Sequence, residues 1–173
     1  AVKLLNAVRR RVASLLGRPS GHVEVDHRAR FPDMDPEFWP IFDACKNYTQ
    51  TGPERMFGLY KAVQHISRFK IEGDIVECGV WRGGSAMLAA MTLVALNDTS
   101  RKIVMYDTYT GMTKPTEEDF RPRTNTAALD KWDDYQAKYE RWNEAPLDDV
   151  KANLLRTGYP AENLVFVAGT VEE

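Results

Sequence analysis

The chain has 173 residues, of which 43% are hydrophobic and 28% charged, and its formal net charge is −2. These values predict a soluble globular protein and give no support for nucleic-acid binding, which needs a clustered basic surface. No apolar run approaches the roughly 20 residues of a membrane-spanning helix. The two cysteines, Cys45 and Cys78, stand in unrelated contexts and form neither a disulfide framework nor a metal motif, so we expect a cytoplasmic location.

Residues 2–16 are expected to form a basic amphipathic helix, with apolar residues on one side and Lys3 and the arginines largely on the other. Gly17 and Pro19 end it. Such a helix packs against its own protein or acts as an arm in a homo-oligomer, and binding to a membrane surface is the alternative. We assign residues 1–48 to an N-terminal helical region.

A further helix is predicted to start at the sequence Thr51-Gly52-Pro53-Glu54. Here the Thr51 hydroxyl and the Glu54 carboxylate would form a capping box. The helix is expected to continue to about Arg68.

Strands and helices alternate from Gly73 onward. The expected strands are 74–78, 102–106 and 163–168, the expected helices are 85–96, 127–142 and 146–157, and residues 108–125 form a long polar loop. This alternation predicts an α/β, Rossmann-like fold with a parallel sheet and right-handed crossovers. Ligands of such sheets bind beyond the carboxyl ends of the strands.

The stretch GDIVECGVWRGGSA, residues 73–86, places a glycine-bearing turn directly after the first strand. A P-loop of the form GxxxxGK[ST] would need a lysine where Ser85 stands, so a triphosphate site is excluded. A dinucleotide fingerprint, GxGxxG, would need a glycine where Trp81 stands. A nicotinamide oxidoreductase is therefore disfavoured.

The remaining pattern, E-x-G-x-x-x-G-G, suits S-adenosylmethionine, which carries an ammonium and a sulfonium but no phosphate. Glu77 can attract the ammonium, and the backbone of residues 79–84 can pass close to a nucleoside. Asp107, after the second strand, is placed to accept the ribose hydroxyls, and Gly169-Thr170, after the third, to border the adenine. Two alternatives stay open: a strand-end acid can instead structure a loop, and Gly83-Gly84 can be an ordinary turn.

The run GDIVECGVWRGGSAMLAAM, followed by YDTYTGM, closely resembles the macrocin O-methyltransferase family, whose members methylate sugar hydroxyls. The upstream run TGPERMFGLYKAV resembles the helix that precedes the sheet in that family. Because the similarity runs from about residue 49 to the end, residues 49–173 are assigned to the N-terminal part of an S-adenosylmethionine-binding methyltransferase domain.

The resemblance implies a class I methyltransferase sheet and a set of site residues. The cofactor contacts that it implies are Glu77, Gly79, Val80, Trp81, Gly83, Ser85, Asp107, Thr108, Gly169 and Thr170. The loop that lies over cofactor and substrate would open with Tyr109, Gly111 and Met112, and residues 51–55 would help to close the methionine end.

The resemblance also implies Mg²⁺, whose aspartate ligands lie on the fourth and fifth strands in that family. The chain ends at Glu173, after the third expected strand, so we expect the metal ligands and the general base outside it and assign no catalytic residue. Glu117, Glu118 and Asp119 are expected to be a solvated surface. Because the fourth strand would pair with the first, Ile75-Val76 should form an unpaired apolar edge.

Two functions from different classes follow from these features. The first is an S-adenosylmethionine-dependent O-methyltransferase that acts on a sugar hydroxyl of a natural product or polysaccharide, with a small sugar or glycoside as its substrate. The alternative is a non-catalytic nucleoside-binding or assembly module with a methyltransferase-like fold.

Overall fold

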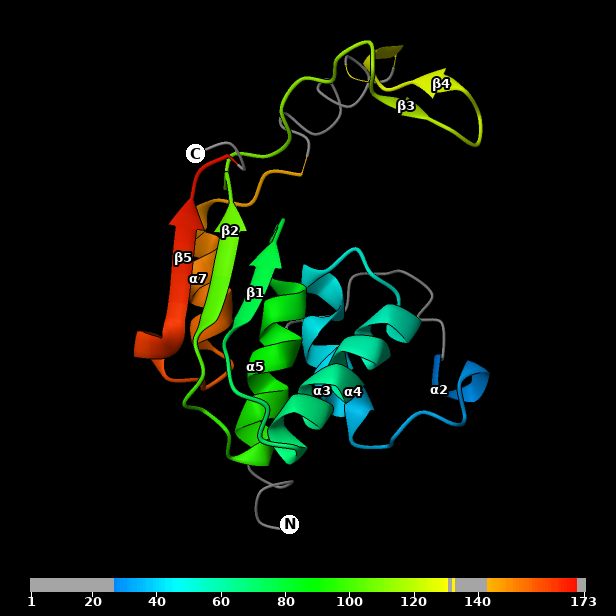
Figure 1. Ribbon diagram of the computed structural model, residues 1–173. Coiled ribbons are helices and arrows are strands. Elements are labelled where there is room, and N and C mark those ends of the chain that lie inside the picture. Colours follow the sequence, from blue (N-terminus) through cyan, green and yellow to red (C-terminus); the bar gives the residue numbers. More distant parts are fainter. Residues whose placement is uncertain (1–26, 131, 133–142, 171–173) are drawn as a thin grey trace.

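The computed structural model describes residues 27–130, 132 and 143–170 (Figure 1). Its elements in chain order are α2 (His27–Arg30), α3 (Phe38–Cys45), the 3-10 helix η1 (Lys46–Tyr48), α4 (Pro53–Arg68), β1 (Ile75–Cys78), α5 (Gly84–Leu96), β2 (Ile103–Asp107), β3 (Phe120–Arg121), β4 (Thr126–Ala127), α7 (Leu147–Leu155), the 3-10 helix η2 (Ala161–Asn163) and β5 (Leu164–Ala168). The amphipathic helix predicted over 2–16, and with it the oligomer arm, lies outside the described residues, as does most of the helix predicted over 127–142.

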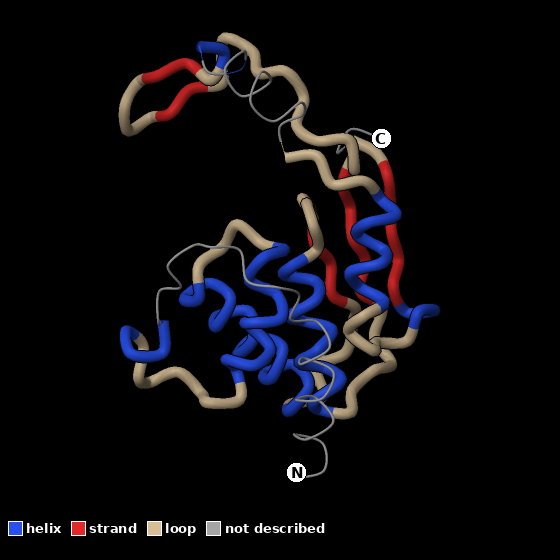
Figure 2. The backbone as a smooth tube through the Cα atoms, turned by 180° about the vertical axis from the view of Figure 1, so that it is seen from behind, coloured by secondary structure: helices blue, strands red, loops and turns tan. Residues whose placement is uncertain are grey.

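Strands β1, β2 and β5 form a parallel sheet in the order β1-β2-β5, which confirms the predicted α/β fold. The register sets Glu77 beside Met105 and Asp107 beside Ala168. Helices α5 and α7 lie on the same face of this sheet (Figures 1 and 2). Because the three strands are parallel, their carboxyl ends lie together at one end of the sheet, with β2 in the middle.

Helix α5 is the centre of the hydrophobic core. It is apolar on all sides, and its residues Met87, Leu88 and Leu93 are fully buried. A helix of this composition is stable in water only when every face is covered. Helices α3 and α4 pack against α5, and the ring of Phe38 joins the two by packing edge-on against Phe57, with the centroids 5.2 Å apart.

The predicted capping box at the start of α4 is wrong, although the predicted end at Arg68 is confirmed. The N-cap is Gly52, which has no side chain to cap with, and Pro53 takes the first helical position, where its missing N–H costs nothing. Thr51 therefore stands one residue too early to cap this helix. Its hydroxyl lies 2.7 Å from that of Thr49 instead.

The expected apolar edge is present along β1, which pairs with β2 alone among the described strands. Val76 is 60% exposed, and Tyr106 on β2 is 45% exposed. Both side chains point away from α5 and α7, since residues alternate between the two faces of a strand. Ile75 points the other way and packs against the core.

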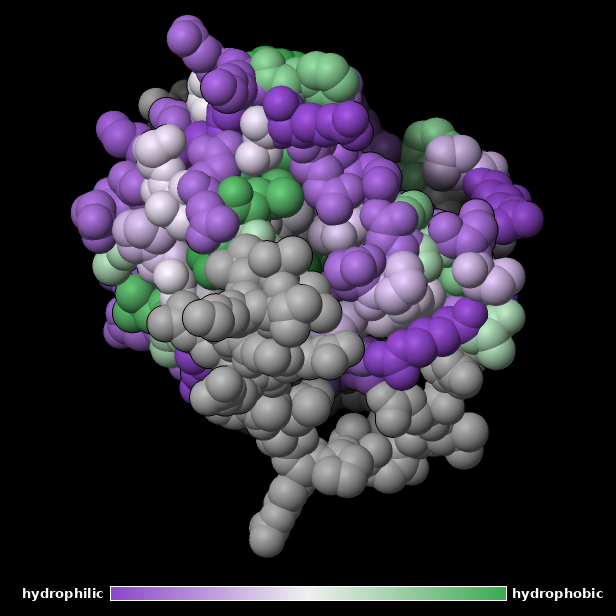
Figure 3. Space-filling view, turned by 90° about the horizontal axis from the view of Figure 1, so that it is seen from below, coloured by the Kyte–Doolittle hydropathy of each residue, from purple (hydrophilic) through white to green (hydrophobic). Residues whose placement is uncertain are grey.

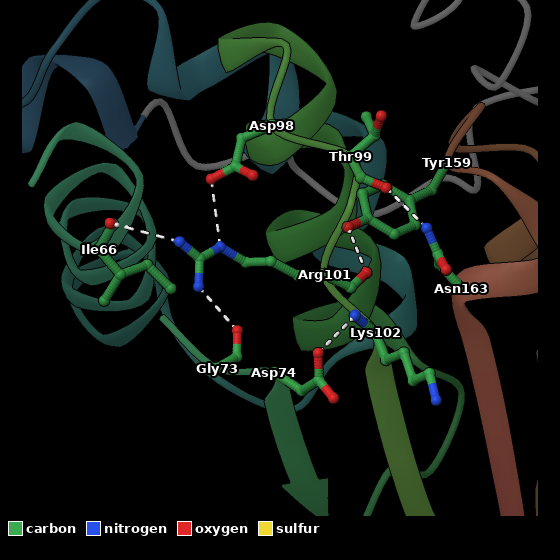
Figure 4. Close-up of polar contacts among 9 residues, drawn as sticks. All are labelled: Ile66, Gly73, Asp74, Asp98, Thr99, Arg101, Lys102, Tyr159 and Asn163. Atoms are coloured by element: carbon green, nitrogen blue, oxygen red, sulfur yellow. Dashed lines mark hydrogen bonds and ion pairs between the residues drawn. The ribbon is translucent and has the colours of Figure 1, made fainter. Parts of the chain in front are cut away.

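An arginine holds together the end of the sheet opposite the strand carboxyl ends (Figure 4). The Arg101 guanidinium donates to the Gly73 carbonyl at 2.7 Å and to Asp98 Oδ2 at 3.1 Å. The Tyr159 hydroxyl donates to the Arg101 carbonyl at 2.8 Å, and Asp74 Oδ1 accepts from the Lys102 amide at 2.8 Å. The described surface seen from below in Figure 3 is mainly hydrophilic, with isolated hydrophobic side chains.

The loop expected over 108–125 leads into a short antiparallel hairpin, β3–β4, which stands away from the sheet on an extended arm (Figure 1). Its second strand, β4, includes Ala127, so the helix predicted over 127–142 does not begin at that residue. Glu117, Glu118 and Asp119 are exposed on this arm, as predicted. Among residues 27–130, 132 and 143–170, no helix is both long enough and apolar enough to cross a membrane.

Candidate functional site

A cavity of about 1180 Å³ opens at the carboxyl ends of the three strands. Its floor comes from the β1–α5 turn and the ends of β2 and β5, and one wall comes from residues 48–51, between α3 and α4. The cavity lies where parallel α/β sheets bind their ligands. Its volume lies just above the upper end of the roughly 300–1,000 Å³ of a typical small-molecule site.

The glycine pair allows the turn to fit between two neighbouring parts of the fold. A Cβ on Gly84 would lie 2.6 Å from the backbone of Tyr48, so only glycine lets the start of α5 approach that wall. A Cβ on Gly83 would lie 2.6 Å from Leu154 Cδ2 on α7, and Gly83 also has a φ of +88°. The pair is therefore explained by packing on both sides of the turn.

The carboxylate of Asp107 accepts three backbone N–H groups. Its Oδ2 accepts from Val80 at 2.6 Å and from Trp81 at 3.0 Å, and its Oδ1 accepts from Tyr109 at 2.9 Å. The predicted ribose acceptor thus also structures the loops, which was one of the open alternatives. Because a carboxylate has about four acceptor sites, one remains for a ligand hydroxyl.

Glu77 presents a buried carboxylate to the same cavity. Its Oε2 is buried and has no hydrogen-bond partner within the described part of the chain. The pKa of Glu77 is raised to about 7. Burial is the largest cause. Hydrogen bonding to the Ser85 hydroxyl and the Ala86 backbone opposes the rise, and the charge of Asp107 adds to it. A buried, unpaired carboxylate oxygen beside a second carboxylate is a site that a cation would stabilise.

Two contacts link the segments around the opening of the cavity. Gln50 Nε2 donates to Asn143 Oδ1 at 2.8 Å, and Asn143 Nδ2 donates to Met112 Sδ at 3.4 Å. The Arg82 guanidinium lies over two aromatic residues of the wall, 5.4 Å from the ring centroid of Tyr48 and 5.7 Å from that of Trp81. Residues from before α4, after β1, after β2 and before α7 thus converge on one site.

Most of the residues singled out in the sequence line this cavity. They are Glu77, Gly79, Val80, Trp81, Ser85, Asp107, Thr108, Gly111, Met112, Gly169 and Thr170. Gly83 and Tyr109 are not among the lining residues, because Gly83 faces α7 and Tyr109 is buried, with its hydroxyl donating to the Met105 carbonyl at 2.9 Å. Burial, with the charges of Asp107 and Glu77, raises the pKa of Tyr109 to about 12, so this donor stays protonated.

Sequence reasoning missed the wall formed by Tyr48, Thr49 and Gln50, and it missed Asn143. No local pattern marks these residues, since Tyr48, Thr49 and Gln50 reach the cavity where η1 packs against Gly84, and Asn143 reaches it from the segment before α7. Glu77 at the end of the first strand and the pair Gly83-Gly84 were the signals in the sequence that located the site.

The described residues do not fit the expected magnesium ion. Within residues 27–130, 132 and 143–170, no group of three or more His, Cys, Asp or Glu side chains lies close enough together to hold a metal ion. No chemistry through a metal is therefore derived for these residues.

Fold and site together define a Rossmann-like α/β protein with an acidic ligand cavity at the carboxyl ends of its strands. The sequence profile of the family described as Macrocin-O-methyltransferase (TylF) matches residues 9–173, and the chain belongs to this family.

Individual relatives agree with this assignment. The chain is 29% identical over 145 residues to 8-demethyl-8-(2,3-dimethoxy-alpha-L-rhamnosyl)-tetracenomycin-C 4'-O-methyltransferase of Streptomyces olivaceus, a match covering 80% of this chain and 50% of the relative. It is 28% identical over 127 residues to mycinamicin III 3''-O-methyltransferase of Micromonospora griseorubida, covering 70% of this chain and 46% of the relative. The chain thus spans about half the length of these curated relatives.

The fold agrees with a solved methyltransferase structure. The O-methyltransferase NovP superposes with a TM-score of 0.55 at 23% sequence identity, over 70% of this chain and 47% of NovP. This similarity supports the class I methyltransferase fold.

Proposed function

We propose that the protein is an S-adenosylmethionine-dependent O-methyltransferase that methylates a sugar hydroxyl of a natural product or polysaccharide. Membership of the macrocin O-methyltransferase family supports the reaction, and the two relatives named above carry O-methyltransferase names. The observation that carries the cofactor assignment is that Glu77 lines the cavity and that one oxygen of its carboxylate, the buried Oε2, has no hydrogen-bond partner in the described part of the chain. An ammonium would supply the partner that this oxygen lacks.

The lining residues suggest how the cofactor would be held. Glu77 would bind the ammonium, and the remaining acceptor site of Asp107 would take a ribose hydroxyl, with Thr108 beside it. Gly169 and Thr170, after β5, would border the adenine. Gly79, Val80 and Trp81 of the β1–α5 turn, with Ser85 in the first turn of α5, would surround the methionine part.

When bound, S-adenosylmethionine supplies an electrophilic methyl group on its sulfonium. The contribution of this chain is to bind and orient the cofactor, since holding reactants in line is worth up to ~7–11 kcal/mol in favourable systems. Gly111 and Met112 line the cavity after β2, where they would border the sugar. No described residue is assigned as the base.

Further parts of the proposal concern the whole protein. We propose a cytoplasmic location, a homo-oligomer formed through residues 2–16, and Mg²⁺ bound by residues outside the described ones. Residues 1–48 would form a helical region, and residues 49–173 would form the N-terminal part of the cofactor-binding domain.

The test of this function is calorimetric titration of the chain with S-adenosylhomocysteine, with NAD as the control ligand. We expect S-adenosylhomocysteine to bind at a 1:1 ratio and NAD not to bind, because Trp81 occupies the position where a pyrophosphate would need glycine. Binding of NAD without binding of S-adenosylhomocysteine would overturn the proposal. A non-catalytic nucleoside-binding module would bind S-adenosylhomocysteine but transfer no methyl group to a sugar acceptor.

A further inference from the structure

Two bulky residues near the carboxyl ends of β1 and β2 have left-handed backbone conformations. Trp81, in the β1–α5 turn, has a φ of +48°, and Tyr109, in the loop after β2, has a φ of +57°. This region is unfavourable for residues that carry a Cβ, and large side chains adopt it only where the surroundings enforce it. Something in the structure must therefore hold both turns.

The amides of these two residues donate to one carboxylate. Trp81 N lies 3.0 Å from Asp107 Oδ2, and Tyr109 N lies 2.9 Å from Asp107 Oδ1. The Val80 amide, next to Trp81, adds a third bond of 2.6 Å to Oδ2. Hydrogen bonds to an ionised acceptor are about twice as strong as neutral ones, and each oxygen here serves a different loop.

We infer that Asp107 is a positioning residue that holds the β1–α5 turn and the loop after β2 in their left-handed conformations, and so shapes the cavity before any ligand enters. This role goes beyond a ribose contact, because three of its roughly four acceptor sites are used by the protein itself. The tests with nucleoside ligands rest on the proposed function, whereas the test on the ligand-free protein does not.

The conformations of these two turns determine where residues around the cavity lie. Trp81 lines the cavity, and the Arg82 guanidinium lies over its ring and over the ring of Tyr48, which also lines the cavity. The Tyr109 side chain is 5% exposed and is fixed by its bond to the Met105 carbonyl. A change at Asp107 therefore displaces parts of the cavity that Asp107 does not touch.

The substitution Asp107→Asn distinguishes positioning of the two loops from contact with the ribose. Asparagine has one acceptor oxygen, and its NH₂ group cannot accept from a backbone N–H, so at least one loop loses its acceptor. The matched control is Asp74→Asn, because Asp74 also accepts a backbone amide, that of Lys102 at 2.8 Å, but at the opposite end of the sheet.

The first measurement is amide hydrogen exchange of the ligand-free protein by NMR. In the wild type we expect the Val80, Trp81 and Tyr109 amides to be protected, and in Asp107→Asn we expect exchange at least about tenfold faster at one loop or both. Asp74→Asn should leave these amides unchanged. If the three wild-type amides exchange as fast as exposed loop amides, the inference is overturned, and this readout needs no variant to fold.

The second measurement is calorimetric titration with S-adenosylhomocysteine and with its 2′,3′-dideoxy analogue. If Asp107 positions the loops, Asp107→Asn weakens both ligands by about tenfold. If Asp107 acts only through the ribose hydroxyls, the dideoxy analogue binds the variant and the wild type equally well, and the inference is wrong. Failure of the wild type to bind either ligand would contradict the proposed function, while the exchange experiment would still decide the role of Asp107.

Discussion

The charge of Asp107 raises the pKa of Glu77, because the two carboxylates face one cavity from neighbouring parallel strands. Asp107 accepts hydrogen bonds from three backbone amides, and Glu77 keeps an unpartnered buried oxygen. With a pKa of about 7, Glu77 is about half protonated at neutral pH in the ligand-free site. A cationic ligand would replace that proton.

The stability of the ligand-free protein should depend on the protonation of Glu77. Because its folded pKa, about 7, lies above the ordinary value of 4.5, the folded state binds more protons than the unfolded state between these values. Its contribution to the free energy of unfolding is thus full below about pH 4.5 and is lost as the pH rises to about 7, by about 1–3 kcal/mol. Urea unfolding at a series of pH values measures this, and Glu77→Gln should remove the dependence from that window.

Binding of S-adenosylhomocysteine should release a proton near pH 6.5, because its ammonium favours the ionised form of Glu77. The affinity should rise with pH and level off above about pH 8, with a slope of at most tenfold per pH unit. Calorimetry in buffers of different ionisation enthalpy counts the released protons. Binding with no proton release at pH 6.5 would show that the ammonium does not pair with Glu77.

The glycine pair should tolerate no side chain. Gly84→Ala would force a Cβ to 2.6 Å from the Tyr48 backbone, and Gly83→Ala would combine a clash at Leu154 with a positive φ, so each should lower the free energy of unfolding by about 1–3 kcal/mol. Gly58→Ala is the matched control, since a Cβ there meets nothing within 4 Å in the middle of α4. It should stabilise the protein by up to about 1 kcal/mol. Equal effects of all three substitutions in urea unfolding would be inconsistent with this packing.

Arg101 should matter for stability and not for ligand binding. Its guanidinium bonds the Gly73 carbonyl and Asp98 at the end of the sheet away from the cavity. Arg101→Met should lower the free energy of unfolding by about 2–3 kcal/mol, and Arg101→Lys should rescue little, because lysine lacks the planar fork. The dissociation constant for S-adenosylhomocysteine should stay within about twofold in both variants; a tenfold change would mean that the two ends of the sheet are coupled.

Much of the fold could be predicted from the sequence because its signals are local. The alternation from Gly73 onward predicted each strand of the sheet to within about a residue. In the sequence, Ser85 excludes a triphosphate site of the P-loop type, and Trp81 argues against a dinucleotide site. The start of α4 was predicted wrongly, because Thr51 resembles a cap while the Gly52-Pro53 pair sets the first turn.

The parts of the site that could not be predicted depend on contacts between distant segments. Gln50 and Asn143 are 93 residues apart and meet through a side-chain hydrogen bond at the cavity. The three amides on Asp107 come with left-handed turns at Trp81 and Tyr109, and nothing in the local sequence marks those turns.

The most direct test of the account is the effect of Glu77→Gln on two ligands, S-adenosylhomocysteine and 5′-methylthioadenosine, titrated at pH 8. Only the first carries an ammonium, and both carry the same nucleoside. We predict that the variant binds S-adenosylhomocysteine about 10–100-fold more weakly, through the loss of a charged hydrogen bond, and binds 5′-methylthioadenosine within about threefold of the wild type. An equal loss for both ligands, or no loss for S-adenosylhomocysteine, would contradict the assignment of Glu77 to the cofactor ammonium.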